Sequence, residues 1–159
     1  MSVYATPKTD FAPGNIPTAA QLNTYGNDIV VLATNNILSV ALSGDYTLTG
    51  SYADVTGMSR SLNKIGDWIV IAPVHCYIDS TGYSASGHIN VRLDVGGTPE
   101  SAIIDAYPIT DILQTQVWKV NVPSGTVTIK LQAKITAGAS TSKLKATNTK
   151  LWAIHVNAA

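Results

Sequence analysis

Three histidines and one cysteine are the side chains in this sequence with the widest range of possible chemistry. His75, His88 and His155 each fall in a stretch expected to form a strand, and none has a second histidine or an acid at metal-ligand spacing. His75 and Cys76 are adjacent, so in a strand they point to opposite faces and cannot pair as base and nucleophile. The sequence therefore predicts structural roles for the three histidines.

Sequence motifs for the common enzyme chemistries are missing as well. There is no G-x-S-x-G elbow, phosphate-binding loop or dinucleotide fingerprint. Asp105 and Asp111 flank an expected turn and could bind a cation, but their spacing is not that of a calcium loop. The tyrosines and tryptophans are scattered over many expected strands, which favours core and interface positions over a sugar platform. We therefore expect no enzyme activity, no cofactor and no metal site.

The charge of this 159-residue chain is low and unevenly distributed. Charged residues make up 13% of the chain, about half the usual share, which suits broad protein contacts. Residues 40–118 hold eight acids and three bases, whereas the chain from Lys119 onward holds six lysines and no acid. Because these lysines alternate with apolar residues, we expect them to pair with acidic strands or subunits and not to bind nucleic acid.

No feature of the sequence points to secretion or to a membrane. The N-terminus lacks the basic-then-apolar pattern of a signal peptide, and the longest apolar runs, near 29–33 and 68–74, are too short to span a bilayer. Cys76 is the only cysteine, so an intramolecular disulfide is impossible. We expect synthesis in a cytosol and no membrane partner.

Residues 1–17 are predicted to form an extended N-terminal arm, because prolines and Gly14 occur there without a helical or alternating period. An aromatic residue gives an extended peptide most of its docking energy, so we expect the arm to contact a neighbouring surface. The alternative is a tail folded back on its own domain. The expected contact residues are Tyr4, Pro7, Phe11 and Pro13.

Residues 18–36 are predicted to form a helix. Thr18 and Gln21 have the spacing of a capping box, in which each side chain satisfies a free backbone donor. Apolar residues recur at steps of three and four and so line one face: Leu22, Tyr25, Ile29 and Leu32. A helix this short is marginally stable alone, so its apolar face packs either on the β domain or on copies of itself in other subunits.

Residues 40–159 are predicted to form an antiparallel β-sandwich of jelly-roll or tulip-like type. About eight expected strands follow one another at intervals of roughly 8–14 residues. The clearest strand is Thr126–Ile135, in which apolar and polar residues alternate. Residues 68–78 are mostly apolar, as expected for a buried strand, and Pro73 implies a bulge or an edge there.

The remaining strands are expected on weaker patterns. Residues 46–49, 53–56, 58–62, 88–95, 102–107 and 112–122 each have a short apolar or alternating pattern. Gly96–Gly97 and residues 123–125 are typical of turns. Leu144–Val156 is expected to form a single last strand, with Trp152, Ile154 and Val156 on one face.

The sequence resembles a family of small tailed-phage virion proteins. Residues 17–32 contain T-A-A-Q-L-N-x-Y followed by Asp28, and this is similar to the helix that opens many of these proteins. The stretches 51–57, 66–70, 125–133 and 150–155 are also similar to the family's β part, so the resemblance covers most of residues 16–156. Gly26 stands where the family usually has Arg or a bulky residue, so a long continuous coiled coil is not expected.

This resemblance implies a trimer of jelly-roll or tulip-like domains with a structural role in a virion. The size of the chain and its N-terminal arm are most similar to a capsid decoration protein, of the kind that cements the heads of thermophilic siphophages. Its partners would be two further copies of itself, the major capsid protein, and neighbouring trimers reached through the arm. The protein would be made in the host cytoplasm and lie on the capsid exterior.

Two alternatives to capsid decoration remain open from the sequence. The first is a receptor-binding or fibre-head module of a phage tail or head fibre, which predicts few copies per particle and binding to host cells. The second is a lectin-like, carbohydrate-binding jelly roll, which predicts a specific response on a glycan array.

Overall fold

The computed structural model describes residues 37–79, 88–100, 111–137 and 141–157, which belong to the unit running from Ile37 to Ala159. The expected arm (1–17), helix (18–36) and strand at 102–107 lie outside the described residues, as does Asp105. The residues proposed for the arm and helix therefore stay predictions: Tyr4, Pro7, Phe11, Pro13, Thr18, Gln21, Leu22, Tyr25, Ile29 and Leu32.

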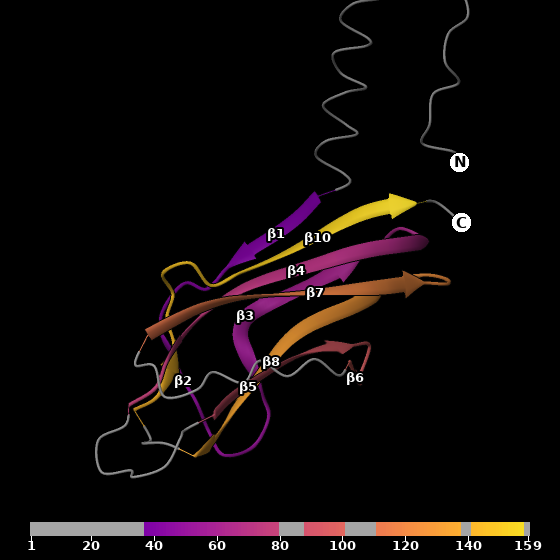
Figure 1. Cartoon of the computed structure of the whole chain (residues 1–159). Helices are drawn as coiled ribbons and strands as arrows, with labels where there is room; N and C mark the ends of the chain where they lie inside the picture. The colour runs from indigo at the N-terminus through magenta and orange to yellow at the C-terminus, as the bar shows by residue number, and fades with distance from the viewer. Residues whose placement is uncertain (1–36, 80–87, 101–110, 138–140, 158–159) are drawn as a thin grey trace, which may run out of the picture. The chain divides into compact units, whose positions relative to one another are not determined.

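The described residues form ten strands in two antiparallel sheets, which confirms the predicted mainly β sandwich (Figure 1). Sheet A contains β1 (Ile37–Ala41), β2 (Tyr46–Thr47), β4 (Gly66–Tyr77), β7 (Asp111–Val122), β9 (Lys143–Leu144) and β10 (Lys150–Asn157). Sheet B contains β3 (Ala53–Leu62), β5 (His88–Val95), β6 (Thr98–Glu100) and β8 (Val127–Ala137). β1 begins earlier than residue 40, where the sequence placed the start of the sandwich.

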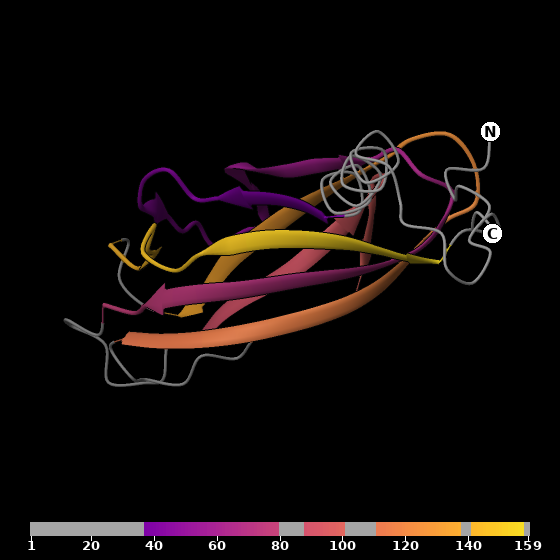
Figure 2. The same ribbon diagram turned by 90° about the horizontal axis from the view of Figure 1, so that it is seen from above.

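The central strand of sheet A is β4. It pairs along its whole length with β7, and its other edge pairs first with β10 and then with β9. β1 pairs with β10, so β1, β10, β4 and β7 lie side by side, and Figure 2 shows this sheet from its outer side. One face of β4 therefore packs into the core, and its other face forms the middle of the outer surface of sheet A.

The core lies between the two sheets. Sheet A contributes Trp68, Trp118 and Leu151, which are buried, and sheet B contributes the alternate residues of β8. Ile129, Leu131, Ala133 and Ile135 of β8 are buried while Thr128 is exposed, which confirms the alternation predicted for this strand. Sheet B therefore has the alternation that one packed face requires.

A bulge joins two stretches that the sequence analysis treated as separate strands. Residues 53–56 and 58–62 form one strand, β3, and its register against β8 shifts between Asp54 and Ser59. Gly57 lies inside this shift with a φ of 80°, a conformation that glycine adopts without the strain of a side chain. Because of the bulge, Val55 and Met58 both point into the core although they are three residues apart.

Pro73 does not form a bulge, but it does lie where one edge of β4 is not paired with a strand. The β4–β7 register runs through Pro73 and Thr115 without a shift. On the other side of β4, Pro73 falls between Ile71, which pairs with β10, and Cys76, which pairs with β9. Proline is tolerated here because no neighbouring strand needs its missing N–H on that side.

The prediction of one last strand over Leu144–Val156 is wrong. β9 ends at Leu144, and β10 begins at Lys150 after a turn in which Asn148 has a φ of 69°. Trp152, Ile154 and Val156 do share a face, but it is the outer face, because Leu151 and Ala153 occupy the core. Because both faces of β10 are apolar, the sequence did not show which of them packs into the core.

Candidate interaction surface

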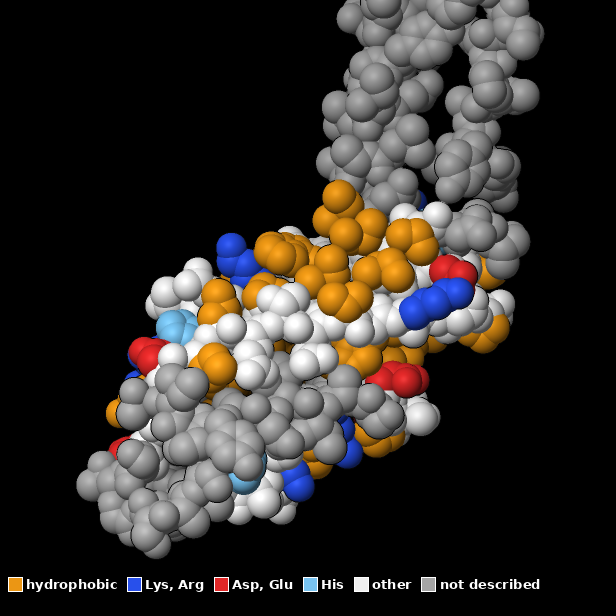
Figure 3. Space-filling model, viewed as in Figure 1, with side chains coloured by type: hydrophobic (Ala, Val, Ile, Leu, Met, Phe, Trp, Pro, Cys, Tyr) orange, Lys and Arg blue, Asp and Glu red, His pale blue; other side chains and the backbone are white. Residues whose placement is uncertain are grey.

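The outer face of sheet A is apolar across four neighbouring strands. Ile37, Ile154 and Ile69 are cross-strand neighbours on β1, β10 and β4. In the adjacent outward row, Trp152 pairs with Ile71, which pairs with Val117 of β7. We define the outer face as these six residues together with Leu113 and Val156, and Figure 3 shows hydrophobic side chains gathered over β1, β10 and β4.

The exposed large apolar side chains of the described residues are concentrated on this outer face. Val117 is 58% exposed, Leu113 and Val156 are 53% exposed, and Ile37 is 51% exposed. The fifth such residue in the described part of the chain, Ile65, lies in the turn between β3 and β4 and is 49% exposed. Scattered apolar residues are normal on a protein surface, whereas a contiguous group of this kind marks an interaction site.

The outer face of sheet B is polar by contrast. Asp54 of β3 accepts hydrogen bonds from Lys130 Nζ and Gln132 Nε2 of β8, each at 2.7 Å. Arg92 of β5 donates from Nε to Gln132 at 2.8 Å, and its guanidinium lies 3.9 Å from the centre of the Tyr52 ring. Sheet B therefore has the solvated outer face of an ordinary sandwich, and sheet A does not.

Paired polar groups border the outer face of sheet A at one end. Lys119 Nζ lies 2.8 Å from Asp67 Oδ2, and Asn121 donates from Nδ2 to Asp67 Oδ1 at 2.8 Å. The hydrogen bonds from Lys119 and Asn121 hold the pKa of Asp67 below its usual range. Lys150 lies at the margin of the face, with Nζ 5.8 Å from the centre of the Trp152 ring.

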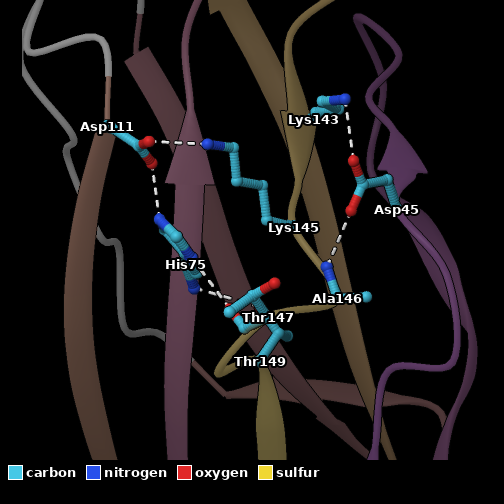
Figure 4. Close-up of polar contacts among 8 residues, drawn as sticks. All are labelled: Asp45, His75, Asp111, Lys143, Lys145, Ala146, Thr147 and Thr149. Carbon is cyan, nitrogen blue, oxygen red and sulfur yellow. Dashed lines mark hydrogen bonds and ion pairs between the residues drawn. The ribbon is translucent and has the colours of Figure 1, made fainter.

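A cluster of His75, Asp111 and Lys145 borders the other end of the outer face (Figure 4). His75 Nε2 lies 2.5 Å from Asp111 Oδ1, and Lys145 Nζ lies 2.6 Å from Asp111 Oδ2. Hydrogen bonds from Lys145 and then His75 hold the pKa of Asp111 below its usual range. The sequence analysis missed this cluster, because its members come from three segments whose register the sequence does not reveal.

The geometry around His75 is that of a structural histidine. Its Nδ1 lies 2.8 Å from the carbonyl oxygen of Thr147, so both ring nitrogens are engaged. Cys76 points to the opposite face and is buried, and burial raises the pKa of its thiol to about 12. The prediction that His75 and Cys76 cannot act as a base–nucleophile pair is therefore confirmed.

Most lysines of the lysine-rich C-terminal third pair with acids of the same chain, as the sequence predicted. Four of its six lysines form ion pairs with acids of the middle third: Lys119–Asp67, Lys130–Asp54, Lys143–Asp45 and Lys145–Asp111. The other two, Lys134 and Lys150, lie over the rings of Tyr52 and Trp152. These lysines are spread over both sheets of the described residues.

Within the described residues, no group of three or more His, Cys, Asp or Glu residues lies together as metal ligands would. The same described ranges contain no helix with the length and hydropathy of a membrane span.

We expect the stability of the protein to fall in acid, because ion pairs such as Asp54–Lys130, between neighbouring strands of sheet B, are then lost. The hydrogen bonds from Lys130 and Gln132 lower the pKa of Asp54 in the folded protein from its ordinary value of 3.8. A lowered folded pKa stabilises the protein above the unfolded pKa, and this stabilisation is lost as the pH falls through the folded pKa. Asp54→Asn should therefore lower the melting temperature at pH 7 and not at about pH 2, where the carboxyl group of Asp54 is protonated. The effect at pH 7 should be small, because a half-exposed ion pair contributes little.

Thermal melts at the two pH values check this prediction. The matched control is Glu100→Gln, which removes an exposed carboxylate of β6 that has no ion-pair partner among the described residues. A loss that is equally large at both pH values in Asp54→Asn would show that the carboxylate charge is not its cause.

Comparisons with known proteins support the fold. No protein-family model and no curated protein matches this sequence. A chain in the structure of the infectious bursal disease virus Gt strain is 12% identical with a TM-score of 0.52, over 75% of this chain and 33% of that one. A chain of T=1 particles derived from infectious bursal virus is 14% identical with a TM-score of 0.54, over 75% and 31%.

These likenesses concern the fold alone, because the identities are low. The β domain is an antiparallel jelly roll, as the sequence analysis predicted. The chain spans about a third of the length of the viral chains that it matches. A murine APRIL crystal structure also aligns, at 11% identity and a TM-score of 0.49, over 76% of this chain and 98% of that one.

Proposed function

We propose that this chain is a structural virion protein of a tailed phage, a homotrimer that binds the outside of the capsid and cements the mature head. The observation that carries the proposal is the outer face of sheet A, which is apolar on an otherwise conventional jelly roll. Such a face suits a protein whose work is to make contacts with other subunits. The proposed role is non-enzymatic and uses no cofactor.

The symmetry of an expanded capsid fits a trimeric protein of this kind. Expanded shells offer threefold and quasi-threefold positions, and a cyclic trimer matches that symmetry. Three copies of the arm (1–17) would dock together, so a modest affinity of each arm gives a high combined affinity. A protein that binds only the mature shell stabilises it by mass action. Cementing therefore requires contacts and symmetry but no reaction.

The direct test is sedimentation of the full-length chain with purified shells of the phage. We expect saturable binding to expanded shells and a higher disruption temperature of the decorated shells. Unexpanded shells are the matched control, because they lack the mature positions. Binding to host cells with no binding to either kind of shell would contradict decoration and favour the receptor-binding alternative. Specific glycan binding without shell binding would favour the lectin-like alternative.

A further inference from the structure

The middle of β4, residues 68–74, has the continuous apolar sequence of a strand buried on both faces, yet the described chain covers only one of them. On the core face, Trp68, Val70 and Ala72 are fully buried. On the outer face, Ile69 and Ile71 are only partly buried, and no strand of sheet B lies over them. Near-continuous apolar strands occur where both faces of a sheet are covered. Something outside the described residues therefore belongs on the outer face.

We propose that the outer face of sheet A is covered by further copies of this chain, which pack around a threefold axis. This inference deepens the proposed function and rests on it, since it names the surface that builds the trimer. The other possible occupants, residues 1–36 and the capsid protein, are outcomes of the test below.

The size of the outer face fits the centre of a subunit interface. Four strands about 4.8 Å apart and about eight residues long give an area of about 500 Å², near the largest apolar patches of monomers. A stable interface buries about 800 Å² on each partner and has an apolar centre with a polar rim. The Asp67–Lys119 pair at one end and the His75–Asp111–Lys145 cluster at the other supply that rim.

The charges bordering the outer face favour a copy of the same chain as the occupant. A surface that meets itself brings like charges together unless they are already paired, and like charges destabilise an interface. Here the carboxylates of Asp67 and Asp111 are each bound to a lysine of the same chain. The border therefore presents two pairs of opposite charge, with Lys150 over the Trp152 ring at its margin, and a second copy can approach it without meeting a concentration of like charge.

The position of the most exposed residues favours a ring over a two-fold dimer. Val117 and Leu113 lie on β7 at one edge of the outer face, and Ile37 lies on β1 at the opposite edge. In a ring, one edge of each copy meets the other edge of the next, and the contact closes after a fixed number of copies. Two exposed apolar edges on a single sheet fit this head-to-tail arrangement.

The test measures the mass of the full-length chain by light scattering, with a charge placed in the outer face. We expect the wild type to have three times the subunit mass of 16.7 kDa. Val117→Asp should raise the dissociation constant of the trimer at least about 100-fold, because each interface would bury an unpaired carboxylate. The matched control is Ile65→Asp, at a similarly exposed apolar residue away from the outer face, and it should leave the mass unchanged.

A second variant separates dissociation from misfolding. Val117 is 58% exposed in the single chain, so substitutions there should not disturb the fold. Val117→Thr keeps the shape and the strand preference of the residue and should weaken the trimer less than Val117→Asp. Circular dichroism should show the same β content in all variants. A wild type of one-subunit mass would overturn the inference, as would a Val117→Asp variant that stays trimeric.

The mass measurement is separate from the test of shell binding, because no capsid takes part in it. An intact trimer that fails to bind expanded shells would refute capsid cementing alone. A wild-type trimer that binds shells, and whose Val117→Asp variant stays trimeric, would refute the inference alone and assign the outer face to residues 1–36 or to the shell.

Discussion

Deleting residues 1–15 should abolish binding of the protein to expanded shells while the β domain remains folded. The proposal assigns shell and neighbour contacts to this arm, whose aromatic residues Tyr4 and Phe11 are its expected anchors. In the proposed trimer three arms would dock together, so losing all three would remove the multiplied affinity at once. Sedimentation with expanded shells measures the loss.

The structure explains why the deletion should be tolerated by the fold. The core of the β domain consists of residues from Leu42 to Ala153, so deletion of residues 1–15 removes none of them. A second variant keeps the full length of the arm and carries Tyr4→Ser and Phe11→Ser. It should also lose most of its shell binding, with an unchanged melting temperature, if the aromatic rings are the anchors. Undiminished shell binding by the truncated chain would contradict the role of the arm.

Replacing Trp68 with alanine should lower the free energy of unfolding by about 3–5 kcal/mol, the range found for large aromatic residues in cores. Trp68 of β4 is fully buried, and its ring centre lies 4.9 Å from that of His155 on β10. Its Nε1 also donates to the carbonyl oxygen of Lys64 at 3.0 Å, which ties the turn before β4 to the core. Alanine would leave a cavity and remove the hydrogen bond to the carbonyl oxygen of Lys64 together.

Chemical denaturation at a fixed protein concentration measures this loss, because the stability of the proposed trimer would depend on concentration. The matched control is Trp68→Phe, which keeps an aromatic ring and loses only the hydrogen bond and part of the packing. It should cost clearly less than alanine. Equal losses in the two variants would show that the hydrogen bond to Lys64, and not the volume of the ring, carries the effect.

The strands of this fold were predictable where one face is apolar and the other polar. The alternation of Thr126–Ile135 placed Ile129, Leu131 and Ala133 in the core, and the structure buries all three. The turn predicted at Gly96–Gly97 is confirmed: both residues have positive φ, and they connect β5 directly to β6. In such segments the local pattern and the tertiary structure favour the same arrangement.

The strands were not predictable where both faces are apolar. In β10, Leu151 and Ala153 alternate with Trp152 and Ile154, and either pair could have been inside by pattern alone. The structure puts the smaller residues in the core and leaves Trp152 on the outer face. The candidate interaction surface follows from this choice, so it became visible only once the partner strands were known.

The polar border of the outer face depends on contacts that are distant in sequence. Asp111 meets His75 and Lys145 only because β4 pairs with β7 in one register and a turn returns the chain beside β4. The sequence analysis predicted that lysines pair with acids, because alternation puts them on the outside of strands. It could not say which acid each lysine meets, since a shift of one residue reverses every side chain.

The number of copies of this protein in one purified phage particle tests the account most directly. Quantitative mass spectrometry against the major capsid protein gives this ratio without assuming any particular interface. Decoration predicts hundreds of copies, in proportion to the threefold and quasi-threefold positions of the shell. About a dozen copies or fewer would contradict cementing and place the protein in a tail or fibre, at the symmetry that such structures have.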